Sequence, residues 1–170
     1  SPGRFKRDRL EAVRRVAASQ GIPCELKRLA SGDTEIHIRL RRGEVTSVLL
    51  VEDDPGAVEL YRRFLAGGNW HVNSVPDPRL TFEMASRFRP DVIILDIMMP
   101  GVDGWSIIKA LRQHETTRSI PLVVCSVLED PQLAEALGAS VYLTKPVSRA
   151  ELLVALNSCL RSRAAASEDD

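Results

Sequence analysis

The 170-residue sequence predicts an α/β fold, a doubly wound five-stranded parallel sheet that follows a small α-β-β appendage. From residue 45 onward, short apolar runs alternate with segments of helical period, which is typical of a parallel sheet with crossover helices. The first 44 residues instead contain one helical pattern followed by two alternating segments. With 44% hydrophobic and 27% charged residues, the composition is that of an ordinary globular protein.

Five segments of the second part have the character of strands, and each is followed by a helical segment. We expect strands at residues 47–52, 71–75, 91–96, 121–126 and 140–143. We expect helices at residues 55–65, 78–88, 105–113, 131–137 and 149–160. Because crossovers between parallel strands are right-handed, the ligand crevice should lie at the carboxyl ends of the strands, where the strand order switches.

We divide the chain into an appendage at 1–44, the α/β domain at 45–161 and a flexible acidic tail at 162–170. In the appendage, residues 8–20 predict an amphipathic helix, and two alternating segments around Ser31-Gly32-Asp33 predict a β-hairpin. This unit is too small to fold alone. It must pack on the rest of the chain, on a second copy, or on a preceding domain of which it is the end.

Several classes of protein are excluded by composition and charge. Cys24, Cys125 and Cys159 are far apart and odd in number, so neither a disulfide framework nor a zinc site is expected. The apolar runs are too short to cross a bilayer, and we expect a cytoplasmic protein without membrane contact. Residues 1–45 hold 11 basic and 6 acidic residues. Because they contain no helix-turn-helix and no interleaved aromatic residues, nucleic acid is an unlikely partner.

Polar side chains gather where the predicted strands end. Glu52, Asp53 and Asp54 follow the first strand, Asp96 ends the third, Ser126 ends the fourth, and Lys145-Pro146 follows the fifth. Since the carboxyl ends of parallel strands meet at one edge of a sheet, the fold should collect these residues into one crevice.

Carboxylates that share one crevice repel each other unless a cation lies between them, and hard oxygen ligands favour Mg²⁺. A carboxylate beside such an ion and a lysine is a competent nucleophile towards a phosphoryl group. A serine hydroxyl nearby can bond one of the transferring oxygens. The crevice is therefore suited to an aspartyl phosphate.

Residues 46–161 resemble the receiver domains of two-component response regulators, which have a flavodoxin-like fold. The resemblance depends on VLLVEDD at 48–54, DVIILDIMMPGVDG at 91–104, Ser126, and YLTKP at 142–146. It implies that Asp96 is the phosphoacceptor. It also implies that Mg²⁺ (or Mn²⁺) is coordinated by Asp53, Asp96 and the backbone carbonyl of Met98, and that Glu52 holds a water bound to the metal.

The same resemblance gives roles to the residues after the fourth and fifth strands. Ser126 would bond a phosphate oxygen, and Lys145 would pair with the phosphoryl group. Tyr142 matches the aromatic switch that turns inward when the serine moves towards the phosphate. The Lys145-Pro146 bond matches a peptide bond that is cis in the family.

Two departures limit what the resemblance implies. Val127 follows Ser126 where the family usually has a small residue, and its branched side chain would crowd the approach to Asp96 as an access gate. The stretch from Ser126 to Lys145 is shorter than usual, and Pro131 lies near the start of its helix. We therefore expect a stunted or displaced fourth helix on the face that the family commonly uses for partners.

The function predicted is that of a receiver that takes a phosphoryl group from a phosphohistidine donor onto Asp96 and switches a protein-interaction surface. Its partners would be a sensor histidine kinase or phosphotransfer protein, and a downstream protein or preceding domain; a homodimer is left open. A phosphatase is disfavoured because Met98 replaces the second aspartate that such an enzyme needs, so at most slow self-catalysed reactions are expected. The alternative is a pseudo-receiver, an interaction module that is never phosphorylated.

The appendage also has a weak resemblance of its own. Its order of helix, strand, turn and strand is similar to the closing elements of a histidine-kinase ATP-binding domain in a hybrid kinase. None of the nucleotide-binding motifs of such a domain is present in residues 1–44.

Overall fold

The computed structural model describes the backbone of residues 24–28, 34–38, 45–128 and 130–168, and side chains within residues 45–128 and 130–163. Residues 1–44 and 45–170 are separate compact units. In the first unit, β1 (Cys24–Arg28) pairs antiparallel with β2 (Thr34–Ile38). This pairing confirms the predicted hairpin, whereas its turn and the helix expected at 8–20 lie outside the described residues.

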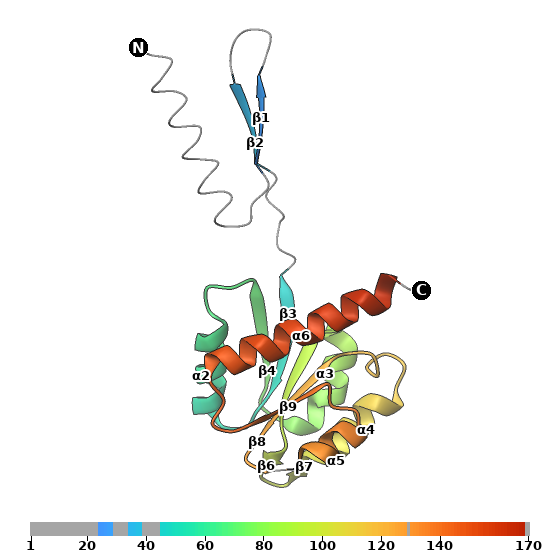
Figure 1. The fold of residues 1–170 in the computed structure, drawn as a ribbon. Coiled ribbons are helices and arrows are strands. Elements are labelled where there is room, and N and C mark those ends of the chain that lie inside the picture. The colour runs from blue at the N-terminus through green and yellow to red at the C-terminus, as the bar shows by residue number, and fades with distance from the viewer. Residues whose placement is uncertain (1–23, 29–33, 39–44, 129, 169–170) are drawn as a thin grey trace. The chain divides into compact units, whose positions relative to one another are not determined.

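The second unit is built on a parallel sheet with the strand order β4-β3-β5-β8-β9 (Figure 1). The strands are β3 (Thr46–Val51), β4 (Trp70–Val75), β5 (Val92–Asp96), β8 (Leu122–Ser126) and β9 (Val141–Thr144). The chain enters at β3, adds β4 on one side and then β5, β8 and β9 on the other. The strand order therefore switches between β3 and β5, and the predicted five-stranded doubly wound sheet is confirmed.

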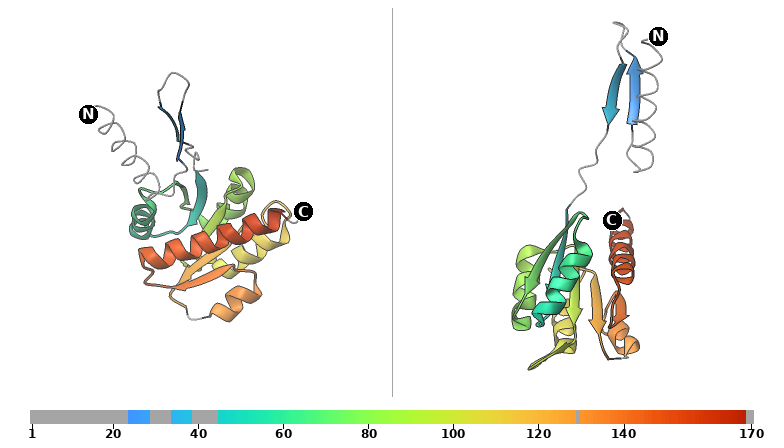
Figure 2. Two further views of the ribbon diagram at one scale, coloured as in Figure 1. Left: turned by 45° about the horizontal axis from the view of Figure 1, so that its top comes forward. Right: turned by 90° about the vertical axis from the view of Figure 1, so that its left-hand side faces the viewer.

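Helices cover both faces of this sheet, as the two views of Figure 2 show. They are α2 (Pro55–Leu65), α3 (Thr81–Phe88), α4 (Gly104–Gln113), α5 (Pro131–Ala136) and α6 (Arg149–Glu168), and a short 3₁₀ helix η1 (Pro78–Leu80) precedes α3. Aspartates begin three of the α-helices, where the side chains of Asp54, Asp103 and Asp130 accept backbone N–H groups of the first turn. These caps fix where each helix leaves the carboxyl edge of the sheet.

Two apolar cores hold the layers together, one on each face of the sheet. In β3 and β5, Leu49 and Ile93 lie in the core shared with α3 and α4, while Val48 and Ile94 lie in the core shared with α2 and α6. All four side chains are fully buried. Burial on both faces explains why these strands are continuous apolar runs rather than alternating ones.

The structure corrects three predictions. The last helix does not end at residue 160, and the flexible tail expected at 162–170 is wrong for most of its length, because α6 continues to Glu168. Alanine favours helix at 164–166, and Arg163 Nη1 donates to the Asp91 carbonyl and carboxylate at 3.1 and 3.2 Å. The second predicted helix does not begin at residue 78, because residues 78–80 form the 3₁₀ helix η1 and α3 begins at Thr81.

The third correction is a small hairpin that the sequence analysis missed, β6 (Met98–Met99) and β7 (Val102–Asp103), directly after β5. The stunted helix expected after Ser126 is confirmed, since α5 has only six residues. Among the helices that the structure describes, none is both long enough and apolar enough to cross a bilayer.

Candidate functional site

The candidate site lies at the carboxyl edge of the sheet, where β3, β5, β8 and β9 end side by side. Parallel pairing places Val51 beside Leu95, Asp96 beside Cys125, and Ser126 beside Thr144. The residues that follow these strands therefore converge although they are up to 93 positions apart in sequence. The predicted convergence of these residues at one edge of the sheet is confirmed.

Three carboxylates form the centre of the site. One oxygen each of Glu52, Asp53 and Asp96 lies within 4.8 Å of the others. Glu52 and Asp96 are buried, with 2% and 6% of their surface exposed, while Asp53 is exposed to solvent. Buried carboxylates require a cation or hydrogen-bond donors, and a group of oxygen ligands with one open side fits Mg²⁺ or a similar divalent ion.

Lys145 supplies the positive charge that this group of carboxylates needs. Its Nζ donates to Asp96 Oδ2 at 2.6 Å and to Glu52 Oε2 at 2.8 Å. Burial alone would lower the pKa of Lys145, because it disfavours the charged ammonium. The hydrogen bonds to Asp96 and Glu52 and the charges of these carboxylates outweigh the effect of burial, so the pKa of Lys145 lies above its ordinary value. The Lys145-Pro146 peptide bond is cis, as the resemblance implied.

Backbone N–H groups hold the remaining oxygens of the two buried carboxylates. Asp96 Oδ1 accepts the N–H of Met98 at 2.8 Å, and Glu52 Oε1 accepts the N–H of Asp54 at 3.2 Å. The Met98 bond was not predicted. The β6–β7 hairpin holds this N–H in place, and its sequence signal is the Pro100-Gly101 turn, where Gly101 has a positive φ of 71°.

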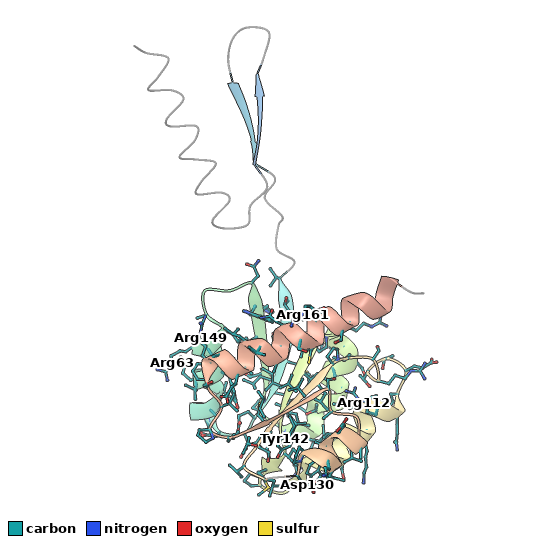
Figure 3. All side chains as sticks on the ribbon, viewed as in Figure 1. Arg63, Arg112, Asp130, Tyr142, Arg149 and Arg161 are labelled. Carbon is teal, nitrogen blue, oxygen red and sulfur yellow. The ribbon has the colours of Figure 1, made fainter. Side chains whose placement is uncertain are left out.

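Ser126 and Tyr142 both contact the backbone of Leu128, a residue that the sequence analysis did not single out. The buried Ser126 Oγ accepts the N–H of Leu128 at 3.1 Å. The Tyr142 hydroxyl donates to the Leu128 carbonyl. The two proposed switch residues are thus linked through both polar groups of one loop residue. Figure 3 shows Tyr142 and Asp130 at the same end of the domain.

The side chain of Val127 lies at the surface with 59% of its area exposed. It lines a cavity of about 410 Å³ together with Tyr61, Lys145 and Pro146. Asp54 lines the same cavity but its Oδ1 accepts the N–H of Gly56 at 2.9 Å, so it acts as the cap of α2. Val127 is therefore beside the crevice, as the prediction of an access gate requires.

Beneath the carboxylates lie two buried groups that the sequence analysis did not assign to the site. Cys125 of β8 lies beside Asp96 of the neighbouring strand β5 and is 1% exposed, and burial raises the pKa of its thiol to about 12. Burial also raises the pKa of the Tyr61 phenol far above its ordinary value, with smaller contributions from Cys125, Glu52 and Asp96. Both groups stay neutral at neutral pH and so add no charge to the site.

Comparisons with known proteins agree with this geometry. The family model described as the response regulator receiver domain matches residues 48–157. The response regulator PleD of Caulobacter vibrioides is 35% identical over 117 residues, which cover 67% of this chain and 26% of PleD. The chain thus spans about a quarter of PleD, and about half of other curated relatives such as HprR of Escherichia coli.

Solved structures give the same result. The receiver domain of the Pseudomonas aeruginosa sensor histidine kinase PA1611, which has a magnesium ion coordinated in its active-site cleft, is 30% identical with a TM-score of 0.62. That match covers 68% of this chain and 97% of the PA1611 domain. The BeF₃-activated receiver domain of Klebsiella pneumoniae RstA is 32% identical with a TM-score of 0.62, over 68% and 99%. By sequence and by fold, this chain belongs to the response regulator receiver domains.

Proposed function

We propose that this receiver accepts a phosphoryl group onto Asp96 from a phosphohistidine of a sensor histidine kinase or phosphotransfer protein, and thereby switches a protein-binding surface. The observation that supports this most is the pair of bonds from Lys145 to Asp96 and Glu52, because it joins three strand ends around one carboxylate. The hydrogen-bond donors and carboxylates around Asp96 are those that phosphoryl transfer needs.

Mg²⁺ (or Mn²⁺) is the cofactor that the carboxylates fit. Asp53, Asp96 and the Met98 carbonyl would hold the ion, with Glu52 acting through a bound water. The support is the cluster of three carboxylate oxygens within 4.8 Å and the magnesium-bound PA1611 domain. When bound, the ion supplies positive charge that neutralises the oxygens of the transferring phosphoryl group.

In the transfer, an oxygen of Asp96 attacks phosphorus, the new O–P bond forms, and the N–P bond to the donor imidazole breaks. The electron pair of that bond stays on the imidazole nitrogen, and the product is an acyl phosphate on Asp96. Lys145 already bonds Asp96 Oδ2 and can pair with a phosphoryl oxygen from the same position. The N–H of Met98 holds Oδ1 and so fixes the orientation of the carboxylate.

The switch follows from the links to Leu128. In this structure the Ser126 hydroxyl accepts a hydrogen bond from the Leu128 N–H. If the Ser126 side chain rotates to bond a phosphoryl oxygen, that hydrogen bond to Leu128 is lost. The loop after β8 then changes its position, and Tyr142, which bonds the Leu128 carbonyl, moves with it. A charge added at Asp96 would in this way alter the surface beside α5 and β9.

We further propose that the protein acts in the cytoplasm as a phosphoacceptor and turns over slowly as a catalyst of its own phosphorylation and dephosphorylation. Two positions after Asp96, where an aspartyl-phosphate phosphatase needs a general acid, Met98 has no ionisable group. The signal would pass to a downstream protein, to a preceding domain, or between two copies of the chain.

Intact mass spectrometry after incubation with acetyl phosphate tests the proposal. The wild type should gain one phosphoryl group in the presence of Mg²⁺, and Asp96→Asn and an EDTA-treated sample should gain none. Failure of the wild type to gain mass, both with acetyl phosphate and with phosphorylated phosphotransfer proteins, would instead establish the pseudo-receiver. A gain of mass in Asp96→Asn equal to that of the wild type would refute the assignment of the phosphoacceptor.

A further inference from the structure

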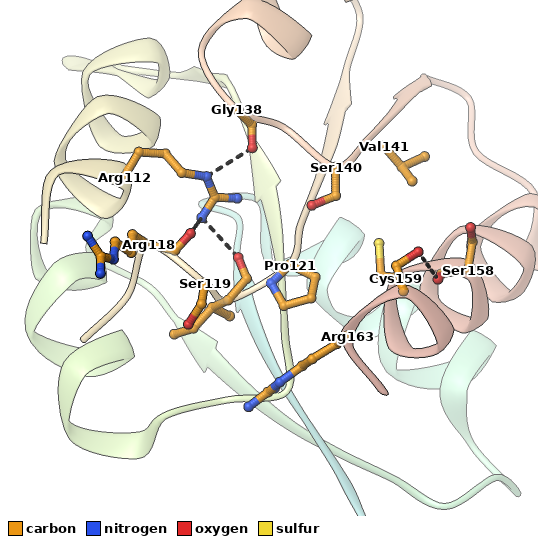
Figure 4. Close-up of a pocket in the computed structure, with 12 residues that line it drawn as sticks. Arg112, Arg118, Ser119, Pro121, Gly138, Ser140, Val141, Ser158, Cys159 and Arg163 are labelled. Carbon is orange, nitrogen blue, oxygen red and sulfur yellow. Dashed lines mark hydrogen bonds between the residues drawn. The ribbon is translucent and has the colours of Figure 1, made fainter. Parts of the chain in front are cut away.

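One cavity of the domain lies away from the carboxylate site. It has a volume of about 590 Å³ and lies at the opposite, amino-terminal edge of the sheet, between the segment before β8, the segment before β9 and the last turns of α6 (Figure 4). Arg112, Arg118 and Arg163 line it, together with hydroxyls of Ser119, Ser140 and Ser158. The receiver chemistry described above uses none of these residues.

A second cavity of about 360 Å³ continues the first, since both are lined by Ser119, Ile120 and Arg163. It extends the hollow to Arg89 at the end of α3. We call the two cavities together the arginine groove, defined by Arg89, Arg112, Arg118 and Arg163. Glu115 is the one carboxylate among the described residues that line it, and it pairs with Arg118 at 3.7 Å, while Asp91 beside the groove pairs with Arg163 at 3.2 Å. Four arginines face these two carboxylates, so the groove carries a net positive charge.

The charge of Arg112 is not matched by a carboxylate. Its Nε donates to the Gly138 carbonyl at 2.9 Å, and its Nη1 donates to the carbonyls of Arg118 and Ile120 at 3.0 and 2.9 Å. None of these bonds uses Nη2, which Figure 4 shows on the side of Ser140. Arg112 is therefore held rigidly while its positive charge faces the groove.

Arg89 provides an independent observation. It ends α3 in the left-handed backbone conformation, with φ 44° and ψ 60°, where glycine is the favoured residue. A basic residue near the end of a helix can interact favourably with the helix dipole. That interaction is also available to a residue with an ordinary helical backbone, so it does not explain the left-handed conformation of Arg89. Arg89 lines the second cavity, so the groove has a guanidinium at a position whose backbone conformation favours glycine.

We propose that the arginine groove binds an acidic peptide segment of a protein partner. Guanidinium groups pair with carboxylates through two parallel hydrogen bonds, and the serine hydroxyls can donate to further oxygens. Two cavities in a row suit an extended segment, whereas a single small anion would fill a fraction of either. No aromatic side chain is among the described lining residues, so the stacking platform that single-stranded nucleic acids use is absent from this part of the groove.

The test is the fluorescence anisotropy of a labelled peptide of alternating glutamate and serine, titrated with the full chain at low and at physiological salt. Arg89→Gly and Arg163→Gln should each weaken binding about threefold, and the double variant about tenfold. Lys109→Gln is the matched control, because it removes one positive charge from an exposed position of α4 outside the groove. It should bind as the wild type does.

Arg89→Gly separates a binding role from a structural one. Glycine is favoured at this backbone conformation, so the variant should melt at or above the temperature of the wild type while it binds the peptide more weakly. Three results would overturn the proposal: no detectable binding at low salt, equal binding by all variants, or displacement of the peptide at lower concentrations by pyrophosphate or a single-stranded oligonucleotide than by unlabelled peptide. Equal binding would locate the peptide elsewhere, for example on the basic residues 1–44.

Discussion

Lys145 lies within 2.6 Å of Asp96 and within 2.8 Å of Glu52, so one ammonium connects the ends of β3 and β5 to the segment after β9. Both carboxylates are buried, and their second oxygens accept backbone N–H groups. The lysine therefore balances the buried negative charge of both carboxylates. In the proposed function, the same ammonium would pair with a phosphoryl oxygen on Asp96.

Replacing this lysine should destabilise the protein most when no divalent cation is present. Lys145→Met leaves two buried carboxylates without their counter-charge, and we expect a loss of about 2–4 kcal/mol in the free energy of unfolding in EDTA. Added Mg²⁺ should recover part of that loss. Urea unfolding with and without Mg²⁺ measures both effects. Lys109→Met, an exposed lysine on α4, is the control, and an equal effect of the two substitutions would contradict this account.

Removal of the branched side chain beside the crevice should speed phosphorylation. Val127→Ala opens the approach that Val127 is predicted to crowd, and we expect a faster gain of phosphoryl group from acetyl phosphate and a faster spontaneous loss. Rates from quenched time courses by intact mass measure this. Val154→Ala, which shortens an exposed valine on α6, is the control. Equal rates for Val127→Ala and the wild type would show that Val127 is not a gate.

Gly104 lets the first turn of α4 approach the backbone of Ile97 closely. A Cβ at this position would lie 2.5 Å from Ile97 Cα and 2.8 Å from its carbonyl oxygen. Gly104→Ala must push the segment after β5 away, so we expect a loss of about 1–3 kcal/mol and slower phosphorylation, because the Met98 N–H would leave Asp96.

Gly56→Ala is the matched glycine substitution in the first turn of α2. Its Cβ would meet the side chain of Asp54 at 3.3 Å, which can adjust. This variant should keep the stability of the wild type within about 0.5 kcal/mol. Thermal and urea unfolding compare the two variants, and a smaller effect for Gly104→Ala than for Gly56→Ala would refute the close contact.

The stability of the protein should fall as the pH rises above about 9. The thiol of Cys125 has an ordinary pKa of 9.0, and burial raises it to about 12 in the folded state. The unfolded chain therefore releases this proton first, and between pH 8 and 10 we expect a loss of about 1 kcal/mol from Cys125. The buried thiol of Cys159 acts in the same direction. Urea unfolding across this range should show a smaller slope for Cys125→Ala, and an unchanged slope would exclude the thiol as the cause.

Much of the domain could be predicted from the sequence because its signals are local. The fully buried residues of β5 are consecutive apolar residues that end in Asp96, and aspartates at helix starts mark where the helices begin. Parallel pairing then brings the strand ends that precede or carry Glu52, Ser126 and Lys145 to the same edge of the sheet as Asp96. The motifs also predicted that Glu52, Asp53 and Asp96 lie close together and that the Lys145-Pro146 bond is cis, and the structure shows both features.

What could not be predicted depends on contacts between segments that have no local pattern. The β6–β7 hairpin has two residues in each strand, which is too short for an alternation to be recognised. The extension of α6 contains Arg163, whose bonds reach Asp91, 72 residues away, and no local pattern reveals them. The links of Ser126 and Tyr142 to Leu128 depend on the shape of one loop, which the sequence does not reveal.

The most direct test of the central claim is to locate the phosphoryl group. Protein phosphorylated with acetyl phosphate and Mg²⁺ is reduced with borohydride, which converts an aspartyl phosphate into homoserine, and the peptides are then sequenced by mass spectrometry. The account predicts homoserine at position 96 and at no other aspartate. Two results would contradict it. One is homoserine at position 53 or 54 instead of 96, and the other is phosphorylated protein whose peptide with residue 96 contains no homoserine.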